Sequence, residues 1–327
     1  MLVRSCLAAV ALLSAFAVAP AAALAQSWPT ATVKLILPLG PGSGADIGAR
    51  LFADRLSKKW GQSIVVENRP GGDSILAITS FIAANDQHTL LFGPSAAFTA
   101  HPYTQPKLTY NPADIVPIAR VSTTLVAMSV PASAKEQTLA ELVARIKAEP
   151  GTLNWAAITG LDDFVFQSFV KANGLVASRV PYRDAVQAMN DLAEGRIHLV
   201  DAAFAIARPH VEGGKVKVLA FMNARRAPIL PDIPTTTEAG FPALRFDGLV
   251  GLYGPRGMPA AVRDQIAADV AAVAANPEIV ARLSATGQVV NAGNPTEFAA
   301  SIDEQRATAA AASKALGLTP VTYTPAQ

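Results

Sequence analysis

A glycine-rich turn with the sequence "LGPGSGADIG" joins an apolar run to an amphipathic segment. Such a turn leaves backbone N–H groups unpaired at the start of a helix, where they can bind an anion. A phosphate-binding P-loop is excluded because residues 40–50 contain no lysine. A dinucleotide fingerprint fits better, but Gly42, Gly44 and Gly48 are spaced one residue too far apart. A tight turn without function would also use glycine. We favour simple anion binding.

The stretch "GPSAA" (residues 93–97) comes close to the nucleophile elbow G-x-S-x-G of serine hydrolases. It lacks the final glycine, and Pro102 stops the following segment before a substantial helix can form. Ser95 is therefore interpreted as a ligand-facing or capping hydroxyl. An exported serine hydrolase that uses Ser95 is the alternative function. The chain has four histidines, none at a spacing that identifies a catalytic base: His88, His101, His198 and His210.

Metal and cofactor sites are not predicted. The one cysteine is Cys6, near the N-terminus, and the histidines are scattered, so no metal-binding pattern is present. Asp162 and Asp163 form an adjacent pair of acids. Two acids at the start of a predicted helix are typical of capping, because carboxylates accept hydrogen bonds from the unpaired N–H groups there. We expect no metal, no cofactor and no catalytic residue, and therefore a protein that is not an enzyme.

The N-terminus has the pattern of a secretory signal peptide. Arg4 precedes the apolar run "LAAVALLSAFAVA", and "ALA" at residues 23–25 is a cleavage motif. We therefore assign residues 1–25 to a signal peptide that is cleaved after Ala25. No later segment is apolar over a membrane-spanning length. The net charge of +2 without a basic cluster argues against a nucleic-acid partner.

The elements around the glycine-rich turn alternate between strands and helices. Strands are expected at residues 32–38, 63–68 and 88–93, and helices at 45–60 and 73–84, the second capped by Asp73. This β-α-β-α-β order predicts a parallel sheet that is covered by helices on both faces.

The rest of the chain predicts a second lobe and a return to the first. Two strands with almost no break are expected at residues 115–131. Helices then alternate with strands, followed by a strand at 247–255 and a mostly helical tail from 260 to about 316. We assign residues 26–122 and 222–327 to lobe one and residues 123–221 to lobe two. The carboxyl ends of the strands in both lobes would then face a shared cleft.

Several longer motifs resemble one family. "PLGPGSGADIGAR" is similar to the family pattern P-F-P-x-G-G-x-x-D-x-x-A-R, with Leu39 in place of the aromatic residue. "VVENRPG", "LPDIPTTTEAG", "GLYGPRGMPAAV" and "VPYRDAVQAMNDLAEGRIHLV" follow in the family's order. The likeness covers nearly all of residues 28–318. The chain therefore resembles the Bug receptors, the extracytoplasmic solute-binding proteins of tripartite tricarboxylate transporters.

The resemblance implies a two-lobed α/β periplasmic-binding-protein fold of type II, with two hinge crossings. It also implies a periplasmic receptor that captures a small organic acid for a membrane transporter or a sensor kinase. We expect a monomer. The ligand carboxylate would be held by the first turn of lobe one and a glycine- and serine-rich loop of lobe two. The candidate ligand-binding residues are Leu39, Gly42, Ser43, Gly44, Asn68, Ser95, Ala96, Thr159, Gly160, Asp162 and Tyr182.

The loop of lobe two departs from the family pattern. "WAAITGLDDF" replaces Y-A-S-x-G-x-G-S-x-x-H-L, so the loop is shorter, loses serines and gains two acids. We expect Asp163 to cap the following helix and Asp162 to face the cleft. An acid there would favour a ligand that bears an amine, amide or hydroxyl as well as a carboxylate.

Overall fold

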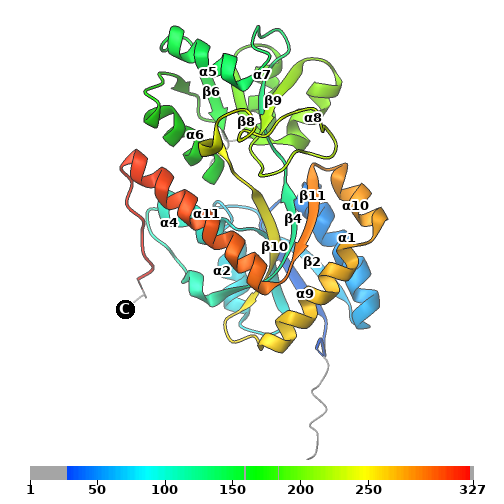
Figure 1. Cartoon of the computed structure of the whole chain (residues 1–327). Coiled ribbons are helices and arrows are strands. Elements are labelled where there is room, and N and C mark those ends of the chain that lie inside the picture. The colour runs from blue at the N-terminus through cyan, green and yellow to red at the C-terminus, as the bar shows by residue number, and fades with distance from the viewer. Residues whose placement is uncertain (1–27, 158–159, 183, 325–327) are drawn as a thin grey trace, which may run out of the picture.

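The computed structural model describes residues 28–157, 160–182 and 184–324, and these form two α/β lobes (Figure 1). The expected signal peptide, its cleavage site and Thr159 lie outside the described residues. Within the described part of the chain, no helix is both long and apolar enough to cross a membrane.

The sheet of lobe one has six strands in the order β11-β4-β10-β3-β1-β2. The first three strands are parallel, as the sequence predicts, but β4, β10 and β11 run antiparallel to their neighbours, so the sheet is mixed. The strands are β1 (Val33–Leu37), β2 (Ile64–Asn68), β3 (Thr89–Pro94), β4 (Ile115–Thr124), β10 (Gly248–Pro255) and β11 (Gln288–Gly293).

Helices cover both faces of this sheet. On one face, Phe52 of α1 (Gly44–Trp60) and Val270 of α9 (Ala260–Ala274) share a buried cluster with the strands, and α10 (Pro277–Ser284) joins them. On the other face, Phe81 of α2 (Ile75–Ala84) and Phe298 of α11 (Pro295–Leu316) pack together. The short helices α3 (Ala96–Thr99) and α4 (His101–Thr104) follow β3.

The sheet of lobe two has five strands in the order β7-β6-β8-β5-β9. Its strands are β5 (Val126–Pro131), β6 (Asn154–Ala157), β7 (Ser178–Arg179), β8 (Leu199–Ala203) and β9 (Val216–Phe221). One face packs on α5 (Leu139–Ala148) and α6 (Leu161–Ala172), the other on α7 (Ala185–Ala193) and α8 (Phe204–Glu212). Figure 1 shows α11 running up to α6, and Ala309 of α11 belongs to the buried cluster around α6.

Two crossings join the lobes. The first is abrupt, because Leu125 alone separates β4 in one sheet from β5 in the other. The second lies later than expected. After β9 the chain stays with lobe two, where Leu244 is fully buried in its core and the N–H of Phe246 donates to Met222 O at 2.8 Å. These contacts place the return near Asp247 rather than near residue 222.

Two local expectations also differ from the structure. Asp73 does not cap α2: Asp73 and Ser74 both have positive φ, 52° and 72°, and α2 begins at Ile75 without a side-chain cap. In addition, the tail contains β11, a strand that the sequence analysis did not predict. Its residues pair with β4, which lies far away in the sequence, and local periodicity carries no signal of such a pairing.

Candidate functional site

The turn before α1 is held by a buried carboxylate. Asp46 is 3% exposed and accepts hydrogen bonds from the Gly42 N–H at 2.9 Å, from Arg50 Nε at 3.1 Å and from Asn68 Nδ2 at 2.8 Å. Burial by itself opposes ionisation, but these donors together lower the pKa of Asp46 below its ordinary value. The turn is therefore shaped before any ligand arrives.

Most of the predicted groups in this turn are engaged within the protein. The Gly42 N–H binds Asp46, and the Ser43 hydroxyl accepts the Asp46 N–H at 3.2 Å as the N-cap of α1. By contrast, the N–H groups of Gly44 and Ala45 have no acceptor among the described residues. These two donors lie at the positive end of the α1 dipole, which makes them the groups that can hold an anion.

Asn68 and Leu39 support the turn. The Asn68 amide donates to Leu39 O at 2.9 Å and to Asp46, while its oxygen accepts from Arg50 at 2.8 Å. The Leu39 side chain packs against the core of lobe one. Both residues therefore position the loop, and the amide of Asn68 is already fully occupied.

Ser95 is buried and engaged in a structural hydrogen bond. It is 5% exposed, and its hydroxyl donates to Gln305 Oε1 of α11 at 2.5 Å. The nearest histidine along the chain, His101, is hydrogen-bonded through Nδ1 to the Tyr110 hydroxyl at 2.6 Å. The described hydrogen-bond partner of the Ser95 hydroxyl is thus an amide, which cannot act as a general base. The neighbouring Ala96 packs against the core of lobe two.

A chain of hydrogen bonds continues from Ser95 to the hinge. Gln305 Nε2 donates to Asp247 O, and Asp247 Oδ1 accepts from Asn223 Nδ2 at 3.3 Å. The Asn223 amide also bridges the first crossing, since it donates to Thr124 O and accepts from Val126 N–H, both at 2.9 Å. The wall of lobe one and both hinge strands are thus connected, a link that sequence reasoning missed.

In lobe two, the N-cap of α6 is Gly160. The expectation that Asp163 caps this helix is therefore wrong. The Asp163 carboxylate is buried and forms a bidentate ion pair with Arg179 of β7, at 2.9 and 2.7 Å. Asp162 is half-buried. Burial and the charge of Asp163 raise the pKa of Asp162 to about 7, although the N–H groups at the start of α6 act in the opposite direction.

A third acid, Asp201, lies in the middle of β8, opposite Ala157 of β6. Its side chain is fully buried, and neither carboxylate oxygen has a hydrogen-bond partner among the described residues. Burial, followed by the charges of Asp162 and Asp163, raises the pKa of Asp201 well above its ordinary value. An aspartate inside the apolar run "HLVDAAF" was the sequence signal for this site.

Asp201→Asn should therefore make the protein more stable in neutral solution. When folding raises the pKa of a carboxyl group, the stability of the folded protein falls as the pH rises from the pKa of the unfolded state, near 4, through the pKa of the folded state. The variant removes that loss. Urea unfolding should show similar stability near pH 4 and a clear advantage for the variant near pH 8. Asp303→Asn, at an exposed position of α11, is the control; parallel pH profiles for Asp201→Asn and the wild type would contradict the assignment.

Tyr182, the remaining predicted residue, is engaged within lobe two. Its hydroxyl donates to Asp191 Oδ2 of α7 at 2.6 Å. Burial and this hydrogen bond raise the pKa of Tyr182 to about 12. Among the described residues, no group of three or more histidine, cysteine, aspartate or glutamate side chains is arranged to hold a metal ion.

A family model described as "Tripartite tricarboxylate transporter family receptor" matches residues 48–318. The chain belongs to this family. A curated relative, a UPF0065 protein of Bordetella bronchiseptica, is 31% identical over 288 residues, which are 87% of this chain and 85% of the relative. Proteins named BugT and BugD are also similar to this chain, which confirms its resemblance to the Bug receptors.

Solved structures that are similar to this chain have the same two-lobed fold. A Rhodopseudomonas palustris protein with adipate has a TM-score of 0.78 and 27% identity, covering 90% of this chain and all of that one (100%). MatC of the same species, with bound malate, has a TM-score of 0.71 and 26% identity, and the match covers 87% of this chain and 100% of the MatC chain. This tricarboxylate-transporter receptor is accordingly a solute-binding protein with a periplasmic-binding-protein fold, and the described surroundings of Ser95 give no support to a serine hydrolase.

Proposed function

We propose that this receptor binds a small organic acid between its lobes and releases it unchanged. The observation that carries the proposal is the turn before α1, where Gly44 and Ala45 present free N–H groups on a frame fixed by Asp46. A carboxylate at this helix start would accept both hydrogen bonds. Each charge-assisted bond is worth about 1.5–3 kcal/mol. The relatives that hold adipate and malate support a ligand with more than one carboxylate.

The acids of lobe two refine the ligand class. Asp162 has a pKa of about 7, so both protonation states are populated in neutral solution. When protonated it can donate a hydrogen bond to a second ligand carboxylate, and when ionised it accepts one from an amine or hydroxyl. We propose that Asp162 faces the cleft, and that plain dicarboxylates bind better below neutral pH whereas amino- or hydroxy-acids bind better above it.

Family membership supports a proposal for the cellular setting. We propose a monomeric periplasmic receptor, exported by a signal peptide that is cleaved after Ala25. Its partner would be the membrane subunits of a tripartite transporter or, for a receptor without one, a sensor kinase. Lobe closure around the ligand would provide the change of shape that such a partner recognises.

A matched pair of glycine variants tests the ligand site. Gly42 and Gly257 both have positive φ, 85° and 84°, and both have open space where a side chain would lie. Gly42→Val should distort the anion-binding turn, whereas Gly257→Val imposes the same backbone strain in the turn between β10 and α9. Gly44 is less suitable, because a Cβ there would lie 3.0 Å from Gln288 Nε2 and disturb β11 as well.

The measurement is thermal stability followed by calorimetric titration with malate, adipate, succinate and aspartate. A ligand at 100 times its Kd should add about 2.7 kcal/mol to the stability of the wild type and of Gly257→Val. Gly42→Val should show little or no such gain. Equal ligand effects in the two variants, or no stabilisation of the wild type by any of these acids, would contradict the proposal.

A further inference from the structure

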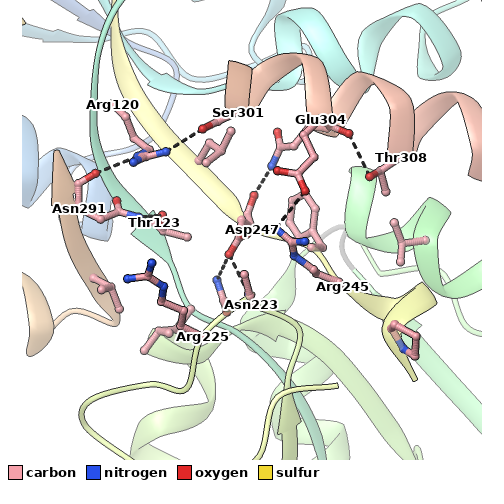
Figure 2. A pocket seen from close by; sticks show the side chains of 18 of the residues that line it. Arg120, Thr123, Asn223, Arg225, Arg245, Asp247, Asn291, Ser301, Glu304 and Thr308 are labelled. Carbon is pink, nitrogen blue, oxygen red and sulfur yellow. Dashed lines mark hydrogen bonds and ion pairs between the residues drawn. The ribbon is translucent and has the colours of Figure 1, made fainter. Parts of the chain in front are cut away.

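A cavity of about 700 Å³ lies beside the hinge, bounded by α11, by β4 and β11, and by the chain on either side of the return crossing (Figure 2). Its walls come from both lobes. Arg120 and Asn291 belong to lobe one, whereas Val165 of α6 and the segment around Arg225 belong to lobe two. None of the predicted ligand-binding residues that the structure describes lines this cavity.

The cavity and the α1 turn lie on opposite faces of the strand pair β4–β11. Thr123 and Val289, which are register partners, line the cavity. The next pair, Thr124 and Gln288, points the other way, and Gln288 lies against Gly44 at the start of α1. Because side chains alternate along a strand, the sheet itself separates the two spaces.

Four arginines line the cavity, and two of them are neutralised. Arg226 forms an ion pair with Glu238 at 2.9 Å and also donates to Pro231 O. Arg245 lies 3.0 Å from Glu304 and 3.8 Å from Asp247. These two guanidinium groups therefore add little net charge to the cavity.

Arg120 and Arg225 have no carboxylate partner among the described residues. Arg120 is held by neutral acceptors, since its Nε donates to Asn291 O at 2.8 Å and its Nη1 to Ser301 Oγ at 2.7 Å. Arg225 is exposed and makes no hydrogen bond with a described residue. Figure 2 shows the two guanidinium groups on one side of the cavity, with Thr123 between them.

We propose that this cavity is a second binding site, for a small organic anion with an apolar body. Its carboxylate, sulfonate or phosphate group lies between Arg120 and Arg225, where the planar guanidinium groups offer paired donors. Its apolar body packs on Val289, Leu249 and Phe246. Since Arg120 belongs to lobe one and Arg225 to the segment packed on lobe two, the anion bridges the lobes behind the hinge.

Arginine variants in adjacent positions test the site. Benzoate, benzenesulfonate and phenyl phosphate serve as probes, titrated by calorimetry and by ligand-detected NMR into the mature protein. Arg225→Gln should weaken binding about tenfold or more, because a charge-assisted contact is lost. Arg226→Gln is the matched control: its side chain lines the same cavity but is already paired with Glu238, so the probe affinity should change less than about twofold.

A second experiment distinguishes probe binding in this cavity from probe binding in the cleft. Gly42→Val, which removes the proposed anion turn of lobe one, should leave probe binding unchanged, and its combination with Arg225→Gln should weaken binding no more than Arg225→Gln alone. The proposal is overturned if none of the probes binds in the millimolar range, if Arg226→Gln weakens binding as much as Arg225→Gln, or if Gly42→Val alone removes it. These outcomes do not depend on whether the cleft binds malate or adipate.

Discussion

Gly251→Ala is expected to destabilise the protein by about 3 kcal/mol or more, because the added methyl group has no room. Gly251 lies in β10, under the fully buried ring of Phe298 from α11. A Cβ at this position would overlap that ring and lie 2.6 Å from Ala119 O. The ring could shift at some cost, but the backbone oxygen belongs to the neighbouring strand β4 and cannot.

Urea unfolding of the variant should show a large fall in the midpoint, with little change in slope. Gly40→Ala is the control, since nothing lies within 4 Å of its Cβ position. Adding Phe298→Leu to Gly251→Ala should recover part of the loss by removing the ring. A midpoint equal to that of Gly40→Ala would show that β10 and α11 do not pack as described.

Arg179→Gln should cost about 3–5 kcal/mol, since it leaves the Asp163 carboxylate buried without its partner. The Asp163 side chain is 7% exposed, and it lies close to two further acids, Asp162 and Asp201. The loss should concentrate on the start of α6, where Gly160 and Asp162 belong to the candidate site. Ligand binding should therefore weaken together with stability.

Urea unfolding at neutral pH checks this prediction. Arg196→Gln is the matched control in the same lobe: Arg196 pairs with Asp191 and Glu194, its side chain is 57% exposed, and exposed pairs contribute about 0–1 kcal/mol. If both variants lost a similar amount of unfolding free energy, the buried Asp163–Arg179 pair would contribute no more to stability than the exposed pairs of Arg196.

Local signals in the sequence were sufficient to predict the first half of lobe one. The apolar run before Pro38 and the amphipathic segment from Asp46 define β1 and α1, and the structure confirms these two elements and the turn between them. Anion binding at this turn stays a prediction. The near-continuous strands β4 and β5 were also predicted, since an apolar run of that length carries two strands. The return crossing was missed because residues 222–246 are rich in proline and lack periodicity, while Leu244 and Phe241 pack on the distant α6.

The partners of the candidate site residues could not be predicted in the same way. Ser95 was interpreted as a ligand-facing or capping hydroxyl, but it is buried, makes no capping hydrogen bond and donates to Gln305 of α11, 210 residues later. Asp163 was expected to cap a helix, which is the commonest use of an acid at that position. Arg179, which lies 16 residues away on β7, instead holds its carboxylate. Such pairings depend on tertiary packing that spacing along the chain does not encode.

The position of β10 has a consequence for the synthesis of the chain. This strand pairs with both β3 and β4, so it fills the middle of the first sheet although it begins only at Gly248. A chain growing from its N-terminus therefore lacks the centre of lobe one until late in translation, and the ring of Phe298 arrives later still. Domains fold as units once their parts are present. Lobe one of the nascent chain thus stays unfolded for most of its time on the ribosome, whereas every strand of lobe two has been made before β10 begins.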